Sequence, residues 1–139
     1  MLKRHNVSSG TKWEEIVGYS RAVRVGNVVE VAGTTAVDEQ GQVVGPGDPY
    51  AQTSFILQKI EQALNAAGAS MSDVVRTRMY ATDIANWEAI GRAHGDYLRA
   101  VKPAATLVEV QSLIDPDLLV EIEVTAIVAA PPATENCEE

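Results

Sequence analysis

The stretch KPAATLVEVQSLIDPDLLVEIEVTAIV, from Lys102 to Val128, decides the fold. It holds two strand patterns, residues 105–110 and residues 119–128, separated by the turn signal Asp115-Pro116-Asp117. In the second pattern, apolar residues alternate with polar ones such as Glu121. This period of two predicts a strand with one face against an apolar core.

Size and composition predict one globular domain. The chain has 139 residues, of which 46% are apolar, so it can bury a sizeable core. We place this domain at residues 1–130 and interpret residues 131–139 as a polar, acidic tail. The single cysteine, Cys137, lies in that tail among glutamates, which excludes an internal disulfide and argues against a reactive thiol.

The net charge and the motifs restrict the classes of function that this chain can have. A formal net charge of −8 argues against binding to nucleic acid or to an anionic membrane, because both need a basic surface. No apolar run approaches the roughly 20 residues of a membrane span, and no signal peptide is recognisable, so a cytoplasmic location is expected. His5 and His94 lack metal-ligand spacing, and no phosphate loop is present, so neither a metal nor a cofactor is expected.

Turn and cap signals divide the rest of the chain into elements. Gly26-Asn27 lies between two valine-rich runs and predicts a tight hairpin, while Asp48-Pro49 predicts a helix start and Gly68 its stop. The expected elements are, in order, a short edge strand at 1–6, a loop at 8–18, hairpin strands within 19–37, a loop at 38–48, a helix to 68, a strand at 74–80, a helix capped by Asn86 and ended by Pro103, and the two closing strands.

This order favours an α+β fold in which one mixed sheet carries two helices packed on one face. The second helix has an apolar stripe from Trp87 to Val101 that includes His94, so we interpret His94 as packed rather than catalytic. The opposite sheet face is partly apolar through residues such as Ile127, which favours oligomerisation.

An ordered set of short motifs resembles the RidA/YjgF family of reactive-intermediate deaminases, whose members also carry the label endoribonuclease L-PSP. The matching segments run through most of the chain and are Tyr19-Ser20-Arg21-Ala22-Val23, Val31-Ala32-Gly33-Thr34, Asn65-Ala66-Ala67-Gly68-Ala69, Val74-Val75-Arg76-Thr77, Pro103-Ala104, Val108-Glu109-Val110 and Val120-Glu121-Ile122-Glu123.

The resemblance implies a chorismate-mutase-like fold and a homotrimer with a central barrel-like core, so the main partner is the chain itself. It implies clefts for a small-molecule metabolite between neighbouring subunits. Deaminating members of the family hydrolyse enamine or imine intermediates to ammonia and a 2-keto acid, without a metal or a cofactor. By position, Glu121 is then the catalytic acid or base, and Tyr19 and Gly33 bind the substrate. Leu107 stands where many members have a small polar residue or cysteine.

The family arginine that pairs with the substrate carboxylate is missing. The pattern Pro-Ala-Arg-(Ser/Thr) here is Pro103-Ala104-Ala105-Thr106, and Gly91 stands near the place of an asparagine found in some members. A lost bidentate contact of this kind costs on the order of 2–5 kcal/mol, so activity on 2-aminoacrylate is expected to be weak or lost. Arg21 and Arg24 are candidates to replace the charge at the substrate site.

Two functions therefore stay open. One is hydrolysis of a small imine or enamine other than 2-aminoacrylate; the other is non-catalytic binding of a metabolite in the same cleft. The nuclease activity attached to the family name is disfavoured by the net charge. We expect Glu123 and Glu109 to pair with Arg76 or Arg78, which leaves Glu121 for the site.

Overall fold

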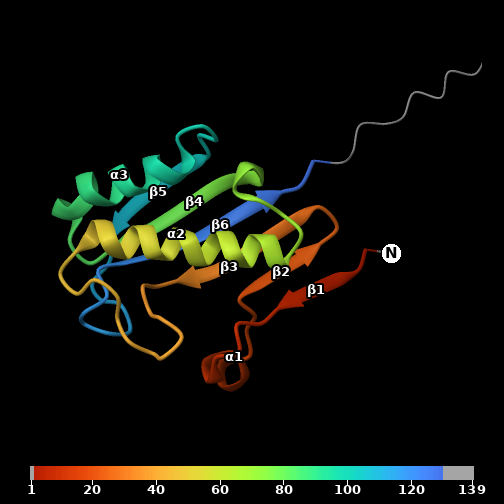
Figure 1. The fold of residues 1–139 in the computed structure, drawn as a ribbon, viewed down its shortest axis with the longest axis horizontal. Helices are drawn as coiled ribbons and strands as arrows, with labels where there is room; N and C mark the ends of the chain where they lie inside the picture. Colours follow the sequence, from red (N-terminus) through yellow and green to blue (C-terminus); the bar gives the residue numbers. More distant parts are fainter. Residues whose placement is uncertain (1, 130–139) are drawn as a thin grey trace, which may run out of the picture.

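The computed structural model describes residues 2–129 and contains one six-stranded sheet (Figure 1). Its strands are β1 (Arg4–Val7), β2 (Ala22–Val25), β3 (Val28–Thr34), β4 (Val74–Ala81), β5 (Ala104–Glu109) and β6 (Val120–Ile127). The helices are α1 (Lys12–Val17), α2 (Pro49–Ala66) and α3 (Trp87–Leu98), with short 3-10 turns η1 (Met71–Asp73) and η2 (Ile84–Asn86). The expected tail at 131–139, including Cys137, lies outside the described residues.

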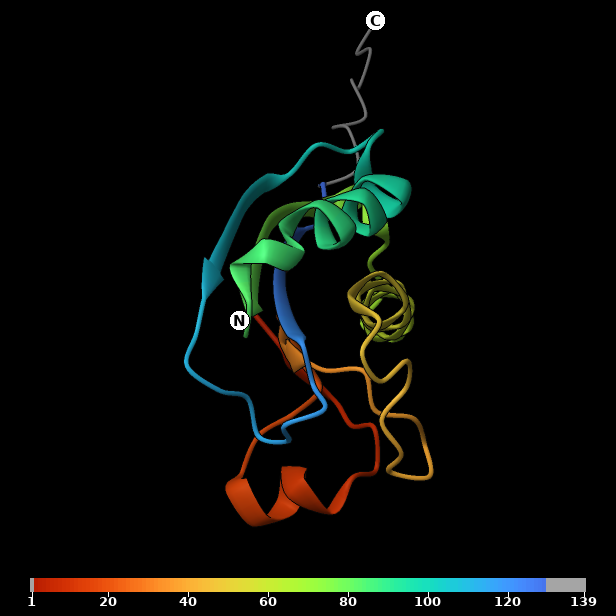
Figure 2. The same cartoon turned by 90° about the vertical axis from the view of Figure 1, so that its left-hand side faces the viewer.

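The strands follow the order β1-β2-β3-β6-β4-β5, and only β4 and β5 run parallel. Seen along its edge, the sheet has α2 and α3 on the same side (Figure 2). The predicted α+β fold, a mixed sheet with two helices on one face, is confirmed. The two closing strands are nevertheless not neighbours, because β4 lies between β5 and β6.

Local signals account for the hairpin and the first long helix. Gly26 has a φ of +60°, and Val25 pairs with Val28 across a two-residue turn. The side chain of Asp48 accepts a hydrogen bond from the amide of Ala51 at 3.0 Å, and a proline occupies the first helical turn. These predictions are confirmed.

The core lies between the sheet and α2. Alternate residues of β6 are buried against α2, and the intervening residues of β6 face the uncovered side. The largest fully buried apolar side chains are Ile56, Leu57, Ile60, Leu64, Ile90, Leu98, Leu118 and Ile122. The side-chain direction of every polar residue on β6 follows from this alternation.

A buried amide connects α2 to the two loops beside it. Gln52 is fully buried, and its Nε2 donates to the carbonyls of Gly45 at 3.3 Å and Asp117 at 2.8 Å. Its Oε1 accepts from the amide of Leu119 at 2.8 Å. Three backbone groups, one in the loop before α2 and two just before β6, therefore depend on one side chain.

Two expectations about local structure are wrong, and a third is met in part. Residues 8–18 are not a loop, because they include the six-residue helix α1, which ends at Gly18 with a φ of +86°. Asn86 occupies the N-cap position of α3 as predicted, but its side chain makes no capping bond. Trp87 lies outside the apolar stripe, since 55% of its surface is exposed.

No helix within the described residues is long and apolar enough to span a bilayer.

Candidate active site

A cavity of about 310 Å³ brings together four of the residues that the sequence singled out. Tyr19, Arg21, Gly33 and Glu121 all line it, although they come from three separate segments of the chain. Part of the remaining wall comes from α1, through Trp13 and other residues. The short helix that the sequence did not predict is thus part of the site.

Glu121 lies directly over Gly33. Val31 and Thr34 of β3, which are three residues apart, pair with Val124 and Ile122 of β6, which are two residues apart. The strand pairing is therefore irregular at the intervening Ala32 and Gly33. A Cβ added at Gly33 would lie 2.7 Å from Oε1 of Glu121 and 3.1 Å from its Cδ. Only glycine therefore lets the carboxyl group occupy this position.

The surroundings of Glu121 favour its protonated form. Partial burial raises the pKa of Glu121, the charge of Arg21 lowers it, and the charge of Glu123 raises it again, with a net increase above 4.5. The side chain of Glu121 makes no hydrogen bond within residues 2–129. It is thus a half-buried carboxyl group that is free to exchange a proton with a ligand.

Arg21 is held in place beside Glu121. Its Nη2 donates to the carbonyl of Gly33 at 2.7 Å, and its guanidinium lies 5.8 Å from the ring centre of Tyr19. Its Nε is buried and has no hydrogen-bond partner in the described part of the chain. Burial lowers the pKa of Arg21, while the charges of Tyr19, Glu14 and Glu121 oppose that change. Tyr19 and Arg21 therefore lie on the same side of the chain, toward the cavity.

Lys59 of α2 is a residue that the sequence did not point to. It lines the same cavity, and its Nζ donates to the carbonyls of Thr35 at 2.8 Å and Val37 at 2.9 Å. Burial and the charge of Arg21 lower its pKa to about 8, against the effect of Asp38. On helical spacing Lys59 is simply one polar residue off the apolar face, so only the tertiary structure identifies it.

Ala105 and Leu107 lie elsewhere in the single chain. Both are on the edge strand β5, where Ala105 pairs with Thr77 and Leu107 with Met79. Ala105 is exposed, and Leu107 packs partly against the core. Neither lines the 310 Å³ cavity, so any contact of theirs with a ligand there requires a second subunit.

Arg24 does not replace the missing family arginine. Its Nε donates to the carbonyl of Gly26 at 2.9 Å, and its Nη1 donates to those of Ala67 at 2.9 Å and Gly68 at 3.1 Å. These bonds direct Arg24 to the end of α2, away from the cavity. Arg24 thus does not line the 310 Å³ cavity of the single chain.

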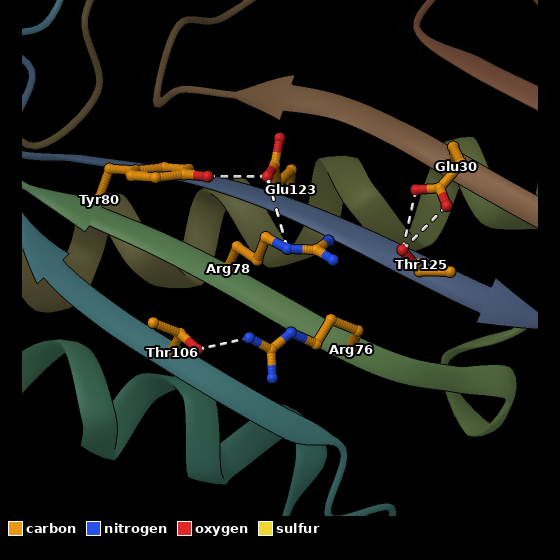
Figure 3. Close-up of polar contacts among 7 residues, drawn as sticks. All are labelled: Glu30, Arg76, Arg78, Tyr80, Thr106, Glu123 and Thr125. Carbon is orange, nitrogen blue, oxygen red and sulfur yellow. Dashed lines mark hydrogen bonds and ion pairs between the residues drawn. The ribbon is translucent and has the colours of Figure 1, made fainter.

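The uncovered sheet face carries a polar network beside the cavity (Figure 3). Glu123 accepts a hydrogen bond from the hydroxyl of Tyr80 at 2.8 Å, and its carboxylate lies 4.0 Å from Nε of Arg78. The expected pairing of Glu123 is confirmed, so Glu121 is the acid that remains for the site.

Two other polar residues differ from expectation or refine it. Glu109 accepts from the amide of Ile84 at 3.0 Å and forms no ion pair with either strand arginine, so its expected pairing is wrong. His94 is half-buried, and its Nε2 lies 2.9 Å from Oγ1 of Thr77. This contact supports the interpretation of His94 as a packed residue.

Residues 2–129 contain no group of three or more side chains suited to hold a metal ion.

The fold and the site together define a class: an α+β protein with a carboxyl group, a guanidinium and a phenol around one small cavity. A family model described as Endoribonuclease L-PSP matches residues 10–128, so the chain belongs to this family, the RidA/YjgF family that its motifs resemble.

Similar proteins agree with this assignment. The crystal structure of Rv2704 from Mycobacterium tuberculosis, a member of the YjgF/YER057c/UK114 family, has a TM-score of 0.82 and 48% identity, over 91% of this chain and 100% of that one. An uncharacterized protein of Streptomyces coelicolor is 41% identical over 86% of this chain and 89% of its own length. The 3-aminoacrylate deaminase RutC of Acinetobacter baylyi is 36% identical over 75% of this chain and 82% of its own length.

Proposed function

We propose that this protein is a deaminase that hydrolyses a small imine or enamine to a carbonyl compound and ammonia. The observation that carries the proposal is the half-buried carboxyl group of Glu121, which has a raised pKa and lies over Gly33 beside Arg21. A general acid or base works best when its pKa is near the working pH. The similarity to a 3-aminoacrylate deaminase supports the same reaction class.

The proposed reaction needs only water and one exchangeable proton. Protonated Glu121 first donates its proton to the enamine carbon, which gives an iminium ion. The Glu121 carboxylate then accepts a proton from water while the water oxygen bonds to the carbon of the C=N group, whose π electrons move to nitrogen. Glu121 returns this proton to the amino nitrogen of the carbinolamine, the C–N bond breaks as the C=O bond forms, ammonia leaves, and the hydroxyl proton passes back to Glu121. Tyr19 and the backbone of Gly33 orient the ligand.

We propose further that three chains assemble through the uncovered sheet face. Apolar side chains of that face are exposed in the single chain, among them Val28 at 38% and Ile127 at 43%. In such a trimer Ala105 and Leu107 approach the cavity from a neighbouring subunit. Light scattering coupled to size exclusion is expected to give about 45 kDa, three times 14.9 kDa. A monomer mass would contradict the inter-subunit site.

The reaction is tested with freshly generated enamines and an assay for released ammonia. We expect acceleration with 3-aminoacrylate, because the similar protein RutC of Acinetobacter baylyi is a 3-aminoacrylate deaminase. We expect little or none with 2-aminoacrylate, whose amino group is on the carbon next to the carboxylate, because the family binds it through the arginine that is alanine at position 105. Glu121→Gln is expected to lower the rate by about 10²- to 10⁴-fold. The control Glu30→Gln removes a carboxylate that accepts a bond from Thr125 on the same face, and it should retain the rate.

A non-catalytic binding module is the competing function, and Ala105 is the observation that favours it. If neither enamine is hydrolysed faster than without protein, while a stable keto acid such as pyruvate binds saturably, the protein binds metabolites and does not deaminate them. That pair of results would refute the deaminase proposal.

A further inference from the structure

Arg21 and Lys59 form the wall between two cavities. Both residues line the 310 Å³ cavity that contains Glu121, and both also line a second cavity of about 530 Å³ next to α2. Among residues 2–129 their charged groups donate only to backbone carbonyls, those of Gly33, Thr35 and Val37. Two cationic side chains from different elements thus meet at the site.

Neither cation has an ion-pair partner in the part of the chain that the structure describes. Within residues 2–129, the ion pairs at 4.0 Å or less join Arg78 to Glu123 and Arg99 to Asp96. Two carboxylates near Arg21 and Lys59, those of Glu14 and Asp38, have other bonding partners, and the raised pKa of Glu121 disfavours the charged form of the third. The carboxylate of Glu14 accepts from the amide and hydroxyl of Ser9 and from the hydroxyl of Thr11, and that of Asp38 accepts from the amides of Gln40 and Gln42.

This arrangement costs free energy that an anion would offset. The two positive charges are partly removed from water, and the charge of Arg21 acts against that of Lys59. The buried Nε of Arg21 has no acceptor among the described residues. A bound carboxylate would supply acceptors to both side chains, with the stronger hydrogen bonds typical of ionised partners.

We propose that Arg21 and Lys59 together bind the carboxylate of the substrate and so take the role of the arginine that the family motif has at position 105. The substrate class is then a small imine or enamine that carries a carboxylate. This inference rests on the proposed function of the same cavity. It also explains how a chain with Ala105 has a carboxylate site, since the charges come from the residue before β2 and from α2 of one subunit.

The proposal predicts a pH dependence. Lys59 is charged below its pKa of about 8 and neutral above it, so carboxylate binding is expected to weaken as the pH rises through this value. The groups that face Lys59 are Arg21 just before β2, Asp38 in the loop after β3, and Glu121 across the cavity on β6. A bound anion raises the pKa of Lys59, so the weakening begins near the pKa of the free protein and continues up to the higher pKa of the complex.

The test compares two probes of the same shape, propionate and propionamide, by NMR titration of the full chain. We expect propionate to bind about 10- to 100-fold more tightly than propionamide at pH 7, with amide shifts at Gly33 and Glu121. Lys59→Met should remove most of that preference, and Lys59→Arg should restore it. The control Lys3→Met removes the same charge from an exposed position and should change nothing.

Several results would overturn the inference. Equal binding of the two probes by the wild type, or a preference unaffected by Lys59→Met, would do so. NMR chemical-shift changes confined to Gln58 and Gln62 would place the anion in the larger cavity and not at the proposed reaction site. If Lys59→Met does not fold, the wild type measured at pH 7 and pH 9.5 decides, because an unchanged affinity at high pH contradicts a role for Lys59.

The two proposals fail in different ways. Selective propionate binding without ammonia release leaves the anion site standing and refutes the deaminase. Ammonia release whose KM is unchanged in Lys59→Met leaves the deaminase standing and refutes the carboxylate site. A raised KM with little change in kcat supports both.

Discussion

Substitution of Gly33 by alanine is expected to displace the Glu121 carboxyl group without unfolding the protein. The new Cβ would lie 2.7 Å from Oε1, whereas ordinary contact begins at 3.4 Å, so Oε1 must move by about 0.7 Å. The carboxyl group is the end of a flexible side chain and can rotate away. Gly33 also has no positive φ, so alanine fits the backbone.

Activity is therefore expected to fall while the fold persists. A misplacement of about 1 Å at a reacting group costs about 10²-fold in rate, so we expect kcat for ammonia release to fall by about 10- to 100-fold. The melting temperature, measured by circular dichroism, should change by no more than about 4 °C.

Gly95→Ala is a matched control on α3. Its Cβ would lie 2.9 Å from Nη2 of Arg99, which is again the end of a flexible side chain, but on an exposed surface. The reasoning is refuted if Gly33→Ala keeps kcat within twofold of the wild type with its fold intact. It is also refuted if Gly95→Ala loses activity to the same degree.

Four further outcomes follow from individual side chains. Gln52→Leu leaves three backbone groups without their partner and should lower the free energy of unfolding in urea by about 2–4 kcal/mol. Glu121→Gln should raise the melting temperature at pH 7, because the folded-state pKa of Glu121 is raised and its charged form is disfavoured; the gain should shrink as the pH falls toward 4.5. Burial lowers the pKa of His94, so stability should fall as the pH drops below 6.5, and titration of unfolding in His94→Gln should show a smaller change. Ala105→Arg should gain release of keto acid from 2-aminoacrylate; no gain in a folded trimer would mean that the cleft has diverged further.

Most of the fold was predictable because its signals are local. The alternation along β6, the two-residue turn at Gly26-Asn27 and the capped start of α2 each depend on neighbouring residues, and each was confirmed. The place of β5 was not predictable in this way. Its pairing with β4 rather than β6 depends on contacts between segments far apart in sequence.

The helix α1 was missed for a different reason. It has only six residues, its first residue follows Thr11 without a side-chain cap, and Ile16 and Val17 are each 69% exposed. A helix without a buried apolar face has no periodic signal in the sequence.

The two main site residues differed in how far the sequence identified them. Glu121 could be identified because it lies in a segment that matches a family motif. Lys59 lies in no such motif, so no sequence pattern was a reason to select it.

The exposed position of Ala105 on the edge strand bears on how this family can change over evolutionary time. Exchanges at exposed positions usually alter stability by less than about 0.5 kcal/mol, so an arginine there can be lost or regained with little effect on folding. Gly33 has no such freedom, because any side chain larger than hydrogen displaces the acid above it. Substrate preference can therefore drift at one edge of the sheet while selection holds the reacting group fixed near its centre.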